Sequence, residues 1–157
     1  MKAHKLFITF AAFFGLVAVI IGALGAHATG LNSPEQGLQN LNSVIASFCA
    51  QCSSISTESL TQINTAVQYQ FYHVAGLLGV GILTTLHRNY GSLLLKLSGT
   101  TFILGILLFS GSLYANALIS NPIFTKLTPL GGISFILAWF FLFLYALTKK
   151  SHVKEDH

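Results

Sequence analysis

Long apolar runs separated by more polar segments dominate the pattern along this chain. Residues 6–26, 97–119 and 130–147 contain no charged side chain, and each approaches the roughly 20 apolar residues that cross a bilayer. A further run, residues 74–86, reaches that length only together with residues 67–73 before it. No regular apolar–polar alternation occurs, so a transmembrane β-barrel is not expected. The pattern predicts an all-α, polytopic membrane protein with spans at about residues 6–27, 66–86, 97–119 and 129–147.

The segment between the first two spans, residues 28–65, carries helix signals of its own. Ser33, Pro34 and Glu35 have the residue types of an N-cap, a first helical position and an acidic first turn. Apolar residues then recur three or four positions apart, at Leu38, Leu41, Ile45, Phe48 and Cys52. This spacing predicts an extra amphipathic helix in the loop, which either lies on the outer membrane surface or caps the ends of the bundle.

Two further helix starts are expected from capping residues. Ser56 or Thr57 has the residue type that caps a helix, and that helix would run through the outer loop into the second span. Thr128 and Pro129 have the residue types of an N-cap and a first helical position for the fourth span. Small residues repeat along the spans and allow close helix approach, so we expect a bundle that forms a single membrane domain over residues 1–157.

The stretch GALGAHATG, residues 22–30, allows a different interpretation of the first span. Ala26, His27 and Ala28 have the small-x-small pattern of a signal-peptide cleavage site. The apolar run before this site is 21 residues long, counted from 6 to 26, whereas the apolar region of a signal peptide has about 7–15. We therefore expect the segment to be retained as the first membrane helix.

Composition supports the membrane assignment, and charge predicts the orientation. Only 8% of the 157 residues are charged, against about 25% in soluble domains, and the mean hydropathy is +0.69. Seven of the eight Lys and Arg residues flank the inner ends of the spans, and only Lys126 lies on the other side. This bias predicts a multi-pass protein of the plasma (inner) membrane with both termini, including the tail 148–157, in the cytoplasm. The basic residues form no stripe, so no nucleic-acid partner is expected.

Polar residues gather at the predicted outer ends of the spans, while the inner halves are almost purely apolar. Such side chains at membrane depth usually face the bundle interior and one another, so an outward-facing polar cluster is a candidate binding site. Aromatic anchoring and ordinary helix-to-helix hydrogen bonds would explain the same residues without a ligand. The candidate cluster comprises His27, Tyr69, Gln70, Tyr72, His73, Ser110, Ser112, Tyr114, Asn116 and Thr128.

Several kinds of chemistry are not expected. No acidic residue lies in a span, which disfavours a proton-coupled carrier. His27 and His73 are too few for a closed zinc site, and no cofactor-binding pattern or catalytic carboxylate pair occurs, so we assign no metal, cofactor or catalytic residue. Cys49 and Cys52 fall near the end of a predicted helix, where a thiolate is disfavoured. They are therefore a possible disulfide or two buried thiols rather than a redox pair.

Four segments together resemble the YgdD-like small membrane proteins, an uncharacterised family that is similar to short eukaryotic transmembrane proteins. In chain order they are GALGAHATGL, AVQYQFYHVAGLL, GILLFSGSLYANAL and LTPLGGISFILAW, and the resemblance covers about residues 4–147. It implies a bundle of four helices in the plasma membrane and no established activity. Under this resemblance the outer loop is longer than the usual one of the family, and Cys49 and Cys52 fall in the added stretch.

Three classes of function remain open at this point. The first is a structural or accessory membrane bundle, with a membrane-protein partner or a homo-oligomer beside the lipid bilayer. The second is a binding or transport module that holds a small solute, a lipid head group or a metal in the outer polar cluster. The third is a membrane enzyme that uses His73 with Tyr69 or Tyr72 as acid and base.

Overall fold

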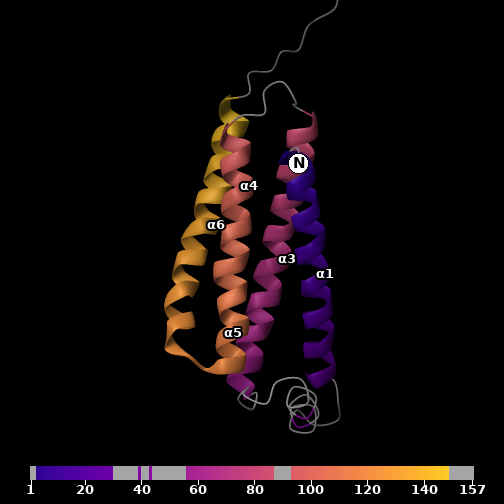
Figure 1. Ribbon diagram of the computed structural model, residues 1–157, viewed down its shortest axis with the longest axis vertical. Coiled ribbons are helices and arrows are strands. Elements are labelled where there is room, and N and C mark those ends of the chain that lie inside the picture. The colour runs from indigo at the N-terminus through magenta and orange to yellow at the C-terminus, as the bar shows by residue number, and fades with distance from the viewer. Residues whose placement is uncertain (1–2, 30–38, 40–42, 44–55, 87–92, 149–157) are drawn as a thin grey trace, which may run out of the picture.

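The fold consists of long helices that lie side by side along the longest axis of the molecule (Figure 1). The computed structural model describes residues 3–29, 39, 43, 56–86 and 93–148. The helices that it gives in these ranges are α1 (Ala3–Thr29), α3 (Thr57–Leu86), α4 (Leu93–Gly105), the π-helical turn η1 (Ile106–Ser110), α5 (Gly111–Ile119) and α6 (Pro122–Thr148). Because α4, η1 and α5 follow one another without a break, they form one rod, and the described part of the chain is all-α, as predicted.

The rods pack in the order of the chain. Helix α1 packs along α3, α4 packs along α6, and α3 packs against the rod of α4, η1 and α5. Figure 1 accordingly shows α1 at one margin of the array and α6 at the opposite margin. A core of buried apolar side chains joins all the rods: Phe7, Ala11, Phe14, Leu77, Val80, Leu95, Phe102, Ile106, Phe135, Ala138 and Tyr145.

The outward faces of the marginal helices are apolar. Phe13 and Leu16 of α1 and Ile136 and Phe143 of α6 are each more than half exposed. Apolar surface of this extent is rare on a soluble monomer, whereas hydrocarbon chains cover it without cost. Within the described residues, three segments are long and apolar enough to cross a membrane: Ala3–Gly25, Leu93–Ile119 and Pro122–Thr148.

Helix α3 differs from these three because its first half is polar. It has 30 residues, but Glu58, Gln62, Gln70 and His73 lower its hydropathy, and it is not among the three segments. The second span, predicted at about residues 66–86, therefore stays a prediction. The predicted amphipathic helix lies almost entirely outside the described residues.

Two side-chain caps and one backbone cap mark three helix ends. Ser56 caps α3 as predicted, because its Oγ accepts a hydrogen bond from the Ser59 N–H at 3.2 Å. Helix α5 ends at Ser120, whose left-handed backbone (φ 52°) lets its N–H donate to the Asn116 carbonyl at 2.9 Å. Asn121 then starts α6, since its Oδ1 accepts from the Ile123 N–H at 3.0 Å.

The predicted start of the last helix at Thr128 and Pro129 is wrong. Helix α6 begins at Pro122, so Pro129 lies inside the helix rather than at its first position. Asn121 and Pro122 repeat the same signature, an N-cap residue followed by proline, about two turns earlier. Thr128 instead donates its hydroxyl to the Phe124 carbonyl of its own helix at 3.2 Å.

Candidate functional site

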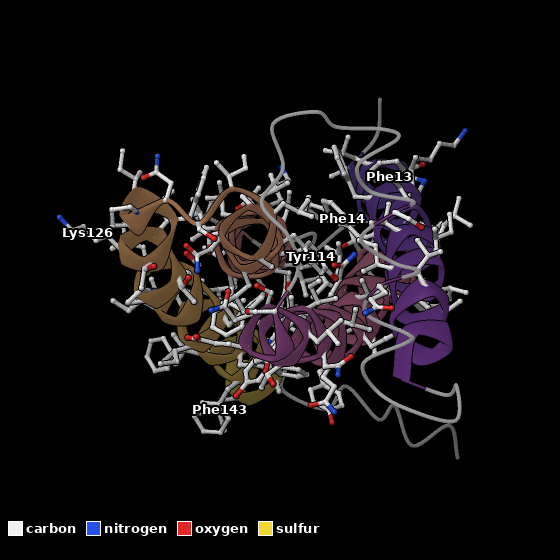
Figure 2. The ribbon with its side chains drawn as sticks, turned by 90° about the horizontal axis from the view of Figure 1, so that it is seen from below. Phe13, Phe14, Tyr114, Lys126 and Phe143 are labelled. Atoms are coloured by element: carbon white, nitrogen blue, oxygen red, sulfur yellow. The ribbon has the colours of Figure 1, made fainter. Side chains whose placement is uncertain are left out.

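Gln70 of α3 joins three helices through one buried amide. Its Nε2 donates to the Phe14 carbonyl of α1 at 2.7 Å, and its Oε1 accepts from the Tyr114 hydroxyl of α5 at 2.9 Å. The side chain is only 2% exposed. Figure 2, an end view, shows Tyr114 and Phe14 toward the middle of the array and Lys126 and Phe143 at its margin. Two members of the predicted cluster thus serve as a clamp between helices.

Hydroxyl groups make two further hydrogen bonds between helices. Ser110, in the π turn, donates to the Ala66 carbonyl of α3 at 3.0 Å. Ser112 of α5 and Thr128 of α6 share a hydrogen bond of 2.8 Å between their hydroxyls. No buried polar side-chain atom of the described residues lacks a hydrogen-bond partner. The buried hydroxyls of the cluster are therefore engaged in joining the rods.

His73 of α3 lies among aromatic rings rather than among the polar residues. Its ring stacks on Phe135 of α6, with centroids 3.4 Å apart and planes inclined by 11°. Tyr69, Phe102 and Trp139 stand around it, with ring centroids 6.0, 6.0 and 6.5 Å away. The Nδ1 atom lies 2.6 Å from the Tyr69 backbone carbonyl, and no tyrosine hydroxyl binds this imidazole among the described residues. We call these five residues the aromatic box.

Two glycines allow close helix contacts beside the aromatic box. A Cβ atom at Gly105 would overlap the ring of Phe135, and one at Gly131 would overlap the backbone of Phe109. Phe109 belongs to η1, and its ring lies 4.7 Å from that of Tyr69. A π turn inserts one extra residue into a helix and often occurs at functional sites. The close contacts of α6 with α4 and with η1 therefore depend on residues without side chains at the contact.

The remaining predicted residues do not join these contacts. Tyr72 is 64% exposed and meets Tyr69 only edge-on, at a centroid distance of 6.3 Å. His27 lies in the last turn of α1, and its side chain is outside the described part of the structure, as are Cys49 and Cys52. The described residues contain no group of three His, Cys, Asp or Glu side chains that could hold a metal ion. The assignment of Tyr72 and His27 to a ligand site therefore stays a prediction.

A polar cavity of about 310 Å³ lies at the end of the bundle where α3 and α6 begin, beside the last turn of α5. Asn116 of α5 crosses one side of it, donating through Nδ2 to the Gln62 Oε1 of α3 at 3.0 Å. The cavity is separate from the aromatic box, since no residue is common to both. Its lining consists of Ser56, Glu58, Ser59, Gln62, Asn116, Ser120, Pro122 and Thr125.

Comparison with known proteins places these features in a family. Residues 21–132, most of the chain, match the family described as "Protein of unknown function (DUF423)". The chain belongs to this family. Its matched region contains Gln70, His73, the π turn, Asn116 and Gly131. No solved structure matches the chain.

Relatives of this DUF423 protein carry the word membrane in their names. The "UPF0382 membrane protein YwdK" of Bacillus subtilis (strain 168) is 33% identical over 143 residues, which cover 91% of this chain and 97% of the relative. The "UPF0382 inner membrane protein YgdD" of Escherichia coli (strain K12) is 27% identical over 146 residues, covering 93% and 92%. The resemblance to YgdD-like proteins is confirmed, and the names agree with helices apolar enough to span a bilayer.

Sequence reasoning found the polar residues but missed the aromatic box. Gln70, Tyr114 and His73 were recognisable because a polar side chain in an apolar helix needs a partner. Phe102 and Phe135 carry no such signal in spans that are rich in phenylalanine. The useful signal was the pair Gly105 and Gly131, since glycine in a membrane helix marks a close approach.

Proposed function

We propose that this DUF423 protein is an integral membrane protein of four spans, with both termini in the cytoplasm, and that it acts as a structural or accessory bundle of the plasma membrane. In this arrangement α3 provides the second span along the chain, in addition to the three apolar segments. Its polar first half faces the outer side and its apolar second half, ending at Leu86, crosses the rest of the bilayer. The order of the rods places the less apolar α3 centrally, where α1 and the rod of α4, η1 and α5 cover it on two sides.

The engagement of the buried polar groups supports this proposal. Gln70, Ser110 and Ser112 are each buried, and each bonds a neighbouring helix. In hydrocarbon an unsatisfied polar group costs several kcal/mol, by order of magnitude, so polar pairs of this kind hold helices in register. Because these side chains already use their hydrogen-bonding atoms between helices, few polar groups remain in the interior for catalysis or ligand binding.

Purification in mild detergent or lipid nanodiscs, followed by native mass spectrometry, tests the accessory role. We expect particles heavier than the 16.9 kDa monomer, containing either a second copy of the chain or a protein partner in fixed ratio. A monomer that carries no protein and a stoichiometric small solute would contradict this role. That result would favour the second candidate function.

The second candidate is a binding module, and the outer polar cavity favours it. Glu58 supplies a carboxylate, and Asn116 and Gln62 supply amides, around a volume of about 310 Å³. Such a cavity suits a small polar solute with both donor and acceptor groups. Under this candidate Gln62→Leu removes the bound solute from the native mass spectrum, while the matched change Gln68→Leu, at an exposed position of the same helix, leaves it in place.

A further inference from the structure

One ring nitrogen of His73 makes no hydrogen bond to the described residues. A carbonyl oxygen can only accept, so the Nδ1 facing the Tyr69 carbonyl at 2.6 Å carries the proton. In the neutral ring the Nε2 atom then holds a lone pair and can accept a hydrogen bond. Among the described residues, nothing donates to it.

The Nε2 atom is also accessible. His73 as a whole is only 8% exposed, but no buried polar side-chain atom of the described residues is unpartnered. Since Nε2 is unpartnered there, it must reach the molecular surface. Tyr69 and Trp139, whose rings flank the imidazole, are 41% and 47% exposed at that surface. The imidazole thus lies beside two aromatic side chains that are themselves partly open at the surface.

Close packing holds the rings around His73 in place. A Cβ atom at Gly76 would lie 2.8 Å from the Phe102 ring and 3.2 Å from the Trp139 ring, so glycine there lets both rings close around the histidine. Phe135 covers one face of the imidazole and fixes its plane. The result is a single hydrogen-bond acceptor held in a fixed direction, in otherwise apolar and aromatic surroundings.

We infer that the aromatic box binds the head group of a lipid-soluble hydroquinone, with a quinol hydroxyl donating to Nε2 of His73. A quinol offers the two features that the box complements: a hydroxyl donor and a planar ring that can pack against Trp139 and Tyr69. The box residues include no cation that would attract a lipid phosphate, and an aliphatic alcohol would not use the rings. The site is independent of the outer cavity and of the accessory role.

Trp139 makes this inference directly measurable, because it is the only tryptophan in the chain. The purified full chain, in nanodiscs free of quinone, is titrated anaerobically with a short-chain benzoquinol and, separately, with the matching benzoquinone. Trp139 fluorescence reports binding. The quinol should bind about fivefold or more tightly than the quinone, because the quinone has only acceptors to set against the Nε2 lone pair. Absence of saturable binding, or equal affinity for both forms, overturns the inference.

Variants test the role of the nitrogen itself. His73→Phe keeps an aromatic ring against Phe135 but removes Nε2, so it should abolish the preference for the quinol. Tyr114→Phe, which loses a hydroxyl outside the box, should keep that preference. If the His73 variant does not fold, the side-chain ¹⁵N resonances of His73 in the unaltered protein decide. A shift of Nε2 on adding the benzoquinol supports the inference, and an unchanged Nε2 resonance refutes it.

Discussion

Gln70 shows how a single residue can hold a membrane bundle together. Its amide has an acceptor oxygen and a donor nitrogen, and both are engaged, one by the Tyr114 hydroxyl and the other by the Phe14 carbonyl. Water cannot replace either partner inside hydrocarbon. The residue is therefore expected to contribute to stability rather than to chemistry.

Replacement of Gln70 by leucine tests this at the residue scale. Gln70→Leu removes two helix-to-helix hydrogen bonds and leaves the Tyr114 hydroxyl without its acceptor, so the free energy of unfolding should fall by about 1–3 kcal/mol. Unfolding by a denaturing detergent in mixed micelles, followed by circular dichroism, measures the change. Gln68→Leu is the control, since Gln68 is exposed on the same helix and should tolerate the change. Equal losses in both variants would argue against the clamp.

Ser98 makes the corresponding bond between α4 and α6. Its hydroxyl is fully buried and donates to the Ala138 carbonyl at 2.8 Å. Ser98→Ala should lower the free energy of unfolding by about 0.5–1.5 kcal/mol. Ser134→Ala, at a serine that bonds only the Leu130 carbonyl of its own helix, should change it by less. The same detergent titration compares the two, and an equal or larger effect at Ser134 would contradict a stabilising role for the bond between helices.

What the sequence predicts at this scale is which residues are unusual, not which partners they take. Gln70 and Tyr114 stand out as polar residues in apolar helices, yet they lie 44 positions apart, and only the packing of α3 on α5 brings them together. His73 was grouped with the polar residues because of its type. Its actual neighbours, such as Phe135, are determined by helix rotation, which composition does not encode.

At the scale of elements, η1 and α6 make the closest of the glycine contacts within the described residues. Gly131 of α6 lies directly against the backbone of Phe109, and backbone cannot move aside as a flexible side chain can. The neighbouring Gly132 has open space where a Cβ would lie. These two glycines form a natural matched pair.

Alanine substitutions at this pair test the contact. Gly131→Ala should destabilise the protein by about 1–3 kcal/mol, because the added methyl group must displace the π turn. Gly132→Ala should be neutral or slightly stabilising, since alanine is the better helix former. Thermal unfolding in nanodiscs provides the comparison. The contact would be refuted if Gly131→Ala melted at the same temperature as Gly132→Ala.

The elements were predictable to different degrees. The apolar runs of α1, the α4–α5 rod and α6 follow from hydropathy alone, because only long apolar helices satisfy their backbones in lipid. The start of α6 was misplaced because Asn121-Pro122 and Thr128-Pro129 carry the same local signature, and the longer helix prevails. The π turn was not predicted from the sequence, and its backbone lies directly against Gly131 of another helix.

At the scale of the whole molecule, α3 is the central helix. It packs along α1 on one side and against α4, η1 and α5 on the other, so it connects the two halves of the array. It is also the least apolar rod, and the four-span account requires that it cross the bilayer with its first turn outside. The bias of Lys and Arg toward the other ends of the spans predicts the same orientation.

Accessibility of the two ends of α3 tests this central claim most directly. Single cysteines are placed at Glu58 in its first turn and at Thr85 near its last, both exposed, in a chain whose Cys49 and Cys52 are serine. A membrane-impermeant maleimide is then applied to intact cells. The account predicts that Glu58→Cys is labelled at once and that Thr85→Cys is labelled only after the membrane is permeabilised. Labelling of both positions from the same side would show that α3 does not span the bilayer.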